Sequence, residues 1–176
     1  MSSLADSLLK QAGHLATVDQ AGAPNQANLR RAISAAYYSL FRLLVDGAAD
    51  RLAGKGSEPA YLLSRAFSHS GMKQACKAFA AGTLKTAVAT HIPSLSIPQD
   101  LRLVCRVFVD LQQKRHQADY DRSLKLTRQG TLTEIKRAQL AFDSYKQLRK
   151  LKSSNPDKKA LEAFQVCLLV YDTVRS

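Results

Sequence analysis

Long stretches of the chain repeat their apolar residues with the period of an α-helix, and no other feature of the sequence limits the fold as strongly. The clearest stretch runs from Asn25 to about Leu52, and its apolar stripe holds Leu29, Ile33, Tyr37, Leu40 and Leu44. No stretch alternates apolar with polar residues as a half-buried strand does, and no Asn-Gly pair offers a hairpin turn. The pattern therefore predicts an all-α fold.

Turn residues divide the first half of the chain. We expect a helix over residues 2–20, the long helix over residues 25–52, and two helices over residues 59–81 that are separated near Ser70 and Gly71. Residues 82–97 are mostly small or polar, which predicts a loop with room for a short helical turn. This loop is the expected mobile element.

Capping signals divide the second half. Ser-x-x-Gln from Ser96 to Gln99 and Thr-x-x-Glu from Thr131 to Glu134 have the form of capping boxes, so each is expected to open a helix. Gln129-Gly130 is the expected break before the second of these helices, and Asn155 is expected to open the last one. Residues 1–176 are then predicted to form a single up-and-down helical bundle with about five main helices.

Length and composition agree with one domain that needs no covalent staple. The chain has 176 residues, and its three cysteines, Cys76, Cys105 and Cys167, are odd in number and form no C-x-x-C pair. We expect them to be buried thiols in a reducing compartment. The N-terminus lacks the pattern of a signal peptide, and no run of about 18 apolar residues occurs, so we expect a cytoplasmic protein without a membrane span.

The formal net charge is +12, and part of the chain carries most of it. Residues 114–159 hold 13 Lys and Arg against 5 Asp and Glu, a balance of +8. Such a field favours anionic partners, namely RNA, DNA, nucleotides or an acidic protein surface, although a solvated helix face with no partner would have the same composition.

The sequence contains no common nucleotide or metal motif. No G-x-G-x-x-G, G-x-x-x-x-G-K-[ST], H-E-x-x-H or EF-hand loop occurs, and the four histidines lie in different segments. We therefore expect neither a cofactor nor a metal.

Two clusters combine arginine with histidine. Arg65 and His69, four residues apart, are expected to project from one face of a helix. A neutral imidazole there could take a proton from a ribose 2′-hydroxyl while the guanidinium stabilises charge on a phosphate. An ordinary surface pair, or a histidine at the edge of the core with a hydrogen bond, would explain the same residues without a function.

The other such cluster runs from Lys114 to Arg122. Arg115, Asp119 and Arg122 are expected on one helix face, with His116 and Tyr120 on the adjacent stripe. Asp119 can hold the Arg115 guanidinium, which makes the pair either a structural link between helices or the floor of an anion site. The pair cannot serve both roles fully, because the Asp119 carboxylate weakens the attraction of Arg115 for a phosphate.

A further cluster lies on the long helix, where Arg31, Tyr37, Tyr38 and Phe41 follow one another within eleven residues. Core packing beside a basic edge would explain these residues without a function. Together with Arg115-x-x-Ala118-Asp119-Tyr120, however, the pattern resembles the HEPN family of small helical domains. The first stretch is similar to the family's R-x-x-x-x-x-Y-Y-x-x-F helix, and the second is similar to the R-x-x-A-D-Y segment of one branch of small bacterial and archaeal members.

The resemblance implies a helical bundle that forms a homodimer through its long helices. Many members are metal-independent ribonucleases of toxin–antitoxin or antiviral systems, and others are non-catalytic nucleotide- or RNA-binding partners. Active members carry, on a late helix, an Arg and a His that are separated by four to six intervening residues. Here Asp119 follows Arg115 at the fourth position, and only Arg65 and His69 approach that spacing.

These observations predict an RNA- or nucleotide-binding protein. If the protein cleaves RNA, His69 or His116 is the expected base, and Arg65 or Arg115 is the expected phosphate stabiliser. Arg31, Tyr38, Asp119, Tyr120 and Arg122 are the expected nucleic-acid-binding residues. The alternative is a non-catalytic adaptor or antitoxin-type partner that docks an acidic protein surface. A DNA-binding bundle is a weaker option, since no recognition helix with its turn occurs.

Overall fold

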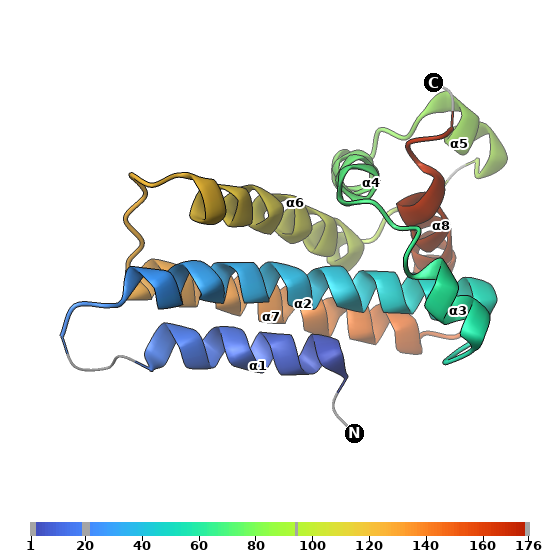
Figure 1. Cartoon of the computed structure of the whole chain (residues 1–176). Coiled ribbons are helices and arrows are strands. Elements are labelled where there is room, and N and C mark those ends of the chain that lie inside the picture. Colours follow the sequence, from blue (N-terminus) through green and yellow to red (C-terminus); the bar gives the residue numbers. More distant parts are fainter. Residues whose placement is uncertain (1–2, 19–21, 94, 175–176) are drawn as a thin grey trace. The chain divides into compact units, whose positions relative to one another are not determined.

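The computed structural model describes residues 3–18, 22–93 and 95–174, and within these ranges the chain is helical with no strand. The prediction of an all-α fold is confirmed. The helices, shown in Figure 1, are α1 Leu4–Thr17, α2 Gln26–Ala53, α3 Glu58–Leu63, α4 His69–Ala81, α5 Thr86–His91, α6 Gln99–Tyr120, α7 Arg128–Lys150 and α8 Pro156–Val170. None of the described helices is both long enough and apolar enough to cross a membrane.

The chain divides by its internal contacts into two compact units. Residues 1–43 and 107–142 form the first unit, and residues 44–106 and 143–176 form the second. The first unit contains α1, the first part of α2, the second part of α6 and most of α7. The second unit contains α3, α4, α5 and α8 together with the remaining parts of the three long helices.

The core of the first unit follows the periodic stripe of α2. Leu29, Ile33 and Tyr37 are all buried there, as expected from their spacing. The ring of Tyr37 lies 5.5 Å from that of Phe108 on α6. Helix α1 contributes a stripe of small and apolar side chains, namely Ala5, Leu9, Ala12 and Ala16.

In the second unit α4 packs against α8. The rings of Phe79 and Phe164 meet edge to face at 5.1 Å, a favourable geometry for aromatic pairs. Cys76, Cys105 and Cys167 are buried and free, as expected. Burial raises the pKa of the Cys167 thiol to about 11, so this thiol is a poor nucleophile at neutral pH.

Two predicted helix starts are confirmed. The Asn25 side chain accepts a hydrogen bond from the amide of Ala27 at 2.9 Å as α2 begins. Asn155 caps α8 in the same way by accepting from Asp157 N at 2.8 Å, and Pro156 occupies the first turn, where a missing N–H costs nothing.

The predicted helix break near Ser70 and Gly71 is wrong. The chain leaves the helical conformation after Leu63, and α4 begins at His69 with Ser68 as its cap, whose Oγ accepts from Gly71 N at 3.0 Å. Gly71 is buried in the first turn of α4, where a Cβ would meet the Asp172 carboxylate at 2.6 Å. The glycine therefore permits close packing instead of ending a helix.

The predicted capping box at Thr131 is also wrong. Helix α7 begins at Arg128, and Thr127 supplies the cap by accepting from Gly130 N at 3.0 Å. Gly130 lies within the first turn and does not break the chain. Thr131 is consequently inside the helix, and its side chain is buried.

The segment between α4 and α6 contains the short helix α5, in keeping with the expected helical turn; whether this segment is mobile stays a prediction. Helix α6 begins at Gln99, the last residue of the expected capping box, and its first hydrogen bond runs from Arg102 N to Pro98 O at 3.0 Å. It ends at Tyr120.

Candidate nucleic-acid interface

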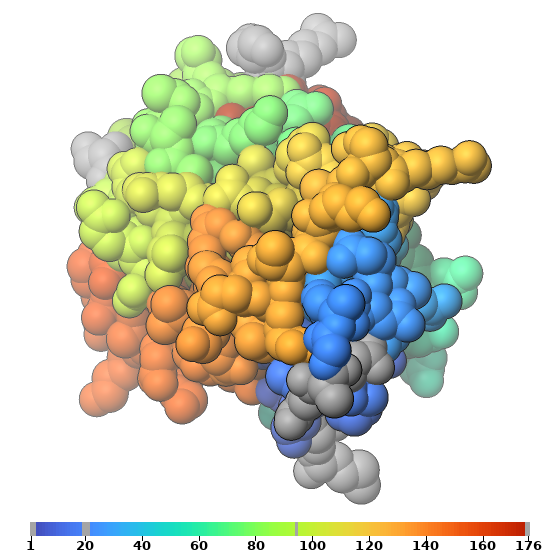
Figure 2. Space-filling view, turned by 90° about the vertical axis from the view of Figure 1, so that its left-hand side faces the viewer, coloured from blue at the N-terminus to red at the C-terminus, as the bar shows by residue number. Residues whose placement is uncertain are grey.

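Seven of the nine expected site residues belong to the first unit. Arg31 and Tyr38 lie on α2, Arg115, His116, Asp119 and Tyr120 lie on the last two turns of α6, and Arg122 lies in the following turn. Figure 2 shows the start of α2, the segment after α6 and the start of α7 gathered on one face of this unit.

Arg115 and Asp119 form the ion pair that the sequence predicts. Arg115 Nε lies 2.7 Å from Asp119 Oδ2, and the two side chains are 25% and 31% exposed. The other carboxylate oxygen accepts a hydrogen bond from Ser34 Oγ on α2 at 3.0 Å. The Arg115 guanidinium also lies over the Tyr38 ring, 5.4 Å from its centroid, so two contacts link α6 to α2 here.

This arrangement favours the structural role of the pair. The charge of Arg115 is balanced by Asp119, and its flat face is covered by Tyr38. A phosphate would have to compete with the carboxylate for the same guanidinium. Arg115 and Asp119 therefore link the two helices.

Arg30 is a residue that the sequence analysis did not place in the site. Its guanidinium donates hydrogen bonds to the carbonyl oxygens of Ala118, Asp121 and Leu124, at 2.5, 2.9 and 2.7 Å. Because Arg30 lies seven residues before the buried Tyr37, it falls on the inward stripe of α2, which was the available signal that it has a partner inside the fold.

Gln26 fixes the far end of the same segment. Its amide nitrogen donates to Leu126 O at 2.8 Å, and its amide oxygen accepts from Leu126 N at 2.9 Å. Residues 121–127 are thus bound to α2 at both ends. This segment carries the exposed side chains of Arg122 and Lys125.

Two aromatic rings are presented to solvent at the end of α6. His116 and Tyr120 lie one turn apart with ring centroids separated by 4.8 Å, which confirms that they share a stripe. Both are exposed, and Tyr120 is 68% exposed, so this pair does not belong to the core. We call His116 and Tyr120 the ring pair.

Basic side chains accompany the ring pair. Arg122 lies two residues after Tyr120 and is exposed. Arg31 is exposed on α2 and lies one turn before Ser34, which contacts α6 through Asp119. Asp121 reduces the local positive charge, because hydrogen bonds from the Ser123 hydroxyl and amide lower the pKa of its carboxyl.

Arg65 and His69 do not share a helix face, contrary to the prediction. Arg65 lies in the turn after α3, whereas His69 is the first residue of α4. Both belong to the second unit and both are exposed. The helical geometry that was the basis for a cooperating acid–base pair is absent at these positions.

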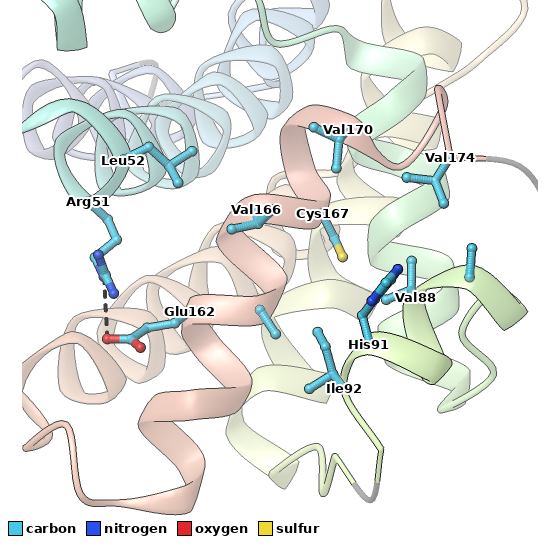
Figure 3. Close-up of a pocket in the computed structure, with 12 residues that line it drawn as sticks. Arg51, Leu52, Val88, His91, Ile92, Glu162, Val166, Cys167, Val170 and Val174 are labelled. Carbon is cyan, nitrogen blue, oxygen red and sulfur yellow. Dashed lines mark hydrogen bonds and ion pairs between the residues drawn. The ribbon is translucent and has the colours of Figure 1, made fainter.

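The second unit contains a largely apolar cavity of about 510 Å³ that the sequence did not indicate. Figure 3 shows Val166, Cys167 and Val170 of α8 along one side of it, with His91 at the end of α5 and the following Ile92 nearby. An ion pair between Arg51 and Glu162, with Nε and Oε1 3.3 Å apart, borders the cavity. This volume lies within the range of small-molecule sites.

Within the described residues, no group of three or more His, Cys, Asp and Glu side chains is arranged to hold a metal ion. Comparison of the chain with known proteins finds no matching family model, curated protein or solved structure.

Proposed function

We propose that the protein is a HEPN-like helical domain that binds single-stranded RNA through the end of α6. The observation that carries the proposal is the ring pair, His116 and Tyr120, exposed at the end of α6 with Arg122 in the turn that follows. Two neighbouring rings left in solvent favour a partner that has a flat apolar surface of its own.

Single-stranded nucleic acids supply such a surface. Their unpaired bases stack on aromatic side chains, and a basic groove neutralises the backbone between them. The first unit offers both elements, since the ring pair has Arg122 beside it and Arg31 on the stripe of α2 that contacts α6. Duplex DNA would offer only its edges and backbone to the same face.

The contacts favour binding over cleavage. A metal-independent ribonuclease requires an imidazole and a guanidinium that are both free to meet one phosphodiester. The Arg115 guanidinium lies against Asp119 and Tyr38, and the neighbouring imidazole of His116 lies against Tyr120. Homodimerisation through the long helices, which the HEPN resemblance implies, is part of this proposal and is measured by sedimentation.

The test is RNA binding across a salt series with wild-type protein and two single variants. Affinity for a short single-stranded RNA should fall as salt rises, because the protein releases counterions from the backbone. Tyr120→Ala should weaken binding by about 1–3 kcal/mol, the range for one lost base stack. Tyr61→Ala, which removes a tyrosine of similar exposure in the second unit, is the matched control.

The outcomes separate this function from the adaptor alternative. An unchanged affinity in Tyr120→Ala, together with equal competition by an acidic polypeptide, would show that only charge is recognised. The basic surface would then be a docking site for an acidic protein. Loss of binding in the Tyr61→Ala control would place the contact in the second unit.

A further inference from the structure

A small cavity of about 210 Å³ lies at the start of α7 in the first unit. It is formed by α2, the end of α6, the segment 121–127 and the first turns of α7. The residues that line it are Ile33, Lys114, Gln117, Leu124, Lys125, Leu126, Thr127, Gly130, Thr131 and Glu134.

The walls combine apolar side chains with one charged pair. Ile33, Leu124 and Leu126 supply the apolar surface. Lys114 and Glu134 supply the charged pair, with Lys114 Nζ 3.2 Å from Glu134 Oε1. The Glu134 side chain is only 13% exposed, and Arg137 holds its other oxygen at 3.0 Å.

The largely buried carboxylate of Glu134 determines what the cavity can accept. Although the cavity lies at a helix N-terminus and has two lysines in its wall, Glu134 would repel a phosphate inside it. A neutral flat ring avoids this repulsion and covers the apolar walls. Its edge would need hydrogen-bond donors for the carboxylate and an acceptor for the Lys114 ammonium.

Thr131 gives an independent indication of a polar ligand. The residue lines the cavity and is 1% exposed, and its Oγ1 is buried with no hydrogen-bond partner among the described residues. A buried hydroxyl without a partner costs free energy, and native proteins rarely leave one in that state. A bound group with a polar ring atom would provide the partner.

We propose that this cavity receives one unpaired guanine base of the RNA. The proposal rests on the RNA-binding function above and names its base preference. Guanine presents the O6 acceptor beside two adjacent donors, N1–H and the N2 amino group. Lys114 would donate to O6 while Glu134 accepts from both donors, and Thr131 would bond a ring nitrogen.

The other bases fit this wall less well. Adenine and cytosine each present a single amino donor next to an acceptor, so the second carboxylate lone pair would stay unused. Uracil has one ring donor between two carbonyl acceptors, and the outer one would face the carboxylate. Lys125, exposed beside the cavity, takes no part in this discrimination and meets the backbone phosphate.

The experiment compares two short oligouridines that differ at one central base, guanine or adenine, on the full chain. Wild-type protein should bind the guanine-containing strand about tenfold more tightly, within the range for one well-read base. Thr131→Val and Glu134→Gln should each reduce this ratio severalfold. Thr133→Val is the matched control, because Thr133 is exposed two residues along the same helix and lies outside the cavity.

Thr131→Val removes a hydroxyl that has no partner among the described residues, so the variant should fold as well as wild type, and thermal unfolding verifies this. Equal affinity for the two strands would overturn the guanine cavity and leave RNA binding intact. A preference that survives in both cavity variants would overturn its location at α7. Absence of salt-dependent binding to either strand would instead overturn the RNA-binding function itself.

Discussion

Gly47 lies against Tyr145 so closely that a Cβ at position 47 would overlap the phenol oxygen. Gln165 joins the two residues, since its side-chain amide donates to the Tyr145 hydroxyl at 2.9 Å and to Gly47 O at 3.1 Å. The parts of α2 and α7 that belong to the second unit thus meet α8 in one buried polar contact. No space is left there for an added methyl group.

Gly47→Ala should destabilise the protein, because the added methyl group must displace the Tyr145 ring and break the bonds of Gln165. Overpacking of this kind costs about 1–3 kcal/mol, measured as the free energy of unfolding in urea. Gly13→Ala is the control. Gly13 lies within α1, where an added methyl group would meet no atom within 4 Å. Alanine there should raise the free energy of unfolding by about 0.5–1 kcal/mol. Equal effects at the two positions would contradict the packing argument.

Tyr145 also makes stability depend on alkaline pH. Burial raises the pKa of its hydroxyl from 10.0 to about 12. The folded pKa is higher than the unfolded one, so the folded state retains the proton while the unfolded chain releases it. The contribution of Tyr145 to the free energy of unfolding is therefore intact below pH 10 and is lost as the pH rises toward 12.

Urea unfolding of wild type and Tyr145→Phe over this pH range measures the effect. The free energy of unfolding of wild type, relative to that of the variant, should fall by roughly 1.4 kcal/mol per pH unit, because phenylalanine has no proton to lose. Other groups that titrate above pH 9 act on both proteins and cancel in the difference. A difference that stays constant with pH would show that the Tyr145 hydroxyl reaches solvent.

The two threonines at the start of α7 should behave oppositely. Thr127→Ala removes the cap that binds Gly130 N and should cost about 1 kcal/mol. Thr131→Val removes a buried hydroxyl that no described residue bonds, so its free energy of unfolding should stay level or rise. Thermal melts of both variants check this order, and a larger loss at Thr131 would restore the capping box predicted from the sequence.

The Arg115–Asp119 pair should show measurable coupling in a double-mutant cycle. Arg115→Gln, Asp119→Asn and the double variant should yield a coupling free energy of about 0.5–1 kcal/mol, since the side chains are partly screened by solvent. A coupling of zero, with RNA affinity reduced by Arg115→Gln alone, would make Arg115 a phosphate contact instead of a link between helices.

The sequence was a reliable guide where a local pattern decides the structure. The stripe on α2 and the asparagine caps of α2 and α8 depend on neighbours within a few residues, and each was predicted correctly. The same holds for the Arg115–Asp119 pair and the ring pair, because residues four apart on a helix always meet.

The sequence misled where two local signals compete or where the partner is distant. Thr127 and Thr131 both resemble caps, and only Thr127 acts as one. Gly71 resembles a helix break, although its role depends on the side chain that packs against it. Arg30 bonds to residues about 90 positions away, and no local pattern reveals those partners. The cavity at α7 arises from four separate segments, so it could be found only in three dimensions.

The hydrogen bonds of Arg30 have a consequence for any anion that approaches the end of α6. A helix normally ends in carbonyl oxygens with a partial negative charge, which would push a nucleic-acid backbone away. Arg30 donates to one carbonyl oxygen of the last turn of α6, that of Ala118, and to the carbonyl oxygens of Asp121 and Leu124 just beyond it, so its guanidinium offsets part of this negative charge. The exposed rings therefore lie at a helix C-terminus whose repulsion of a polyanion is reduced.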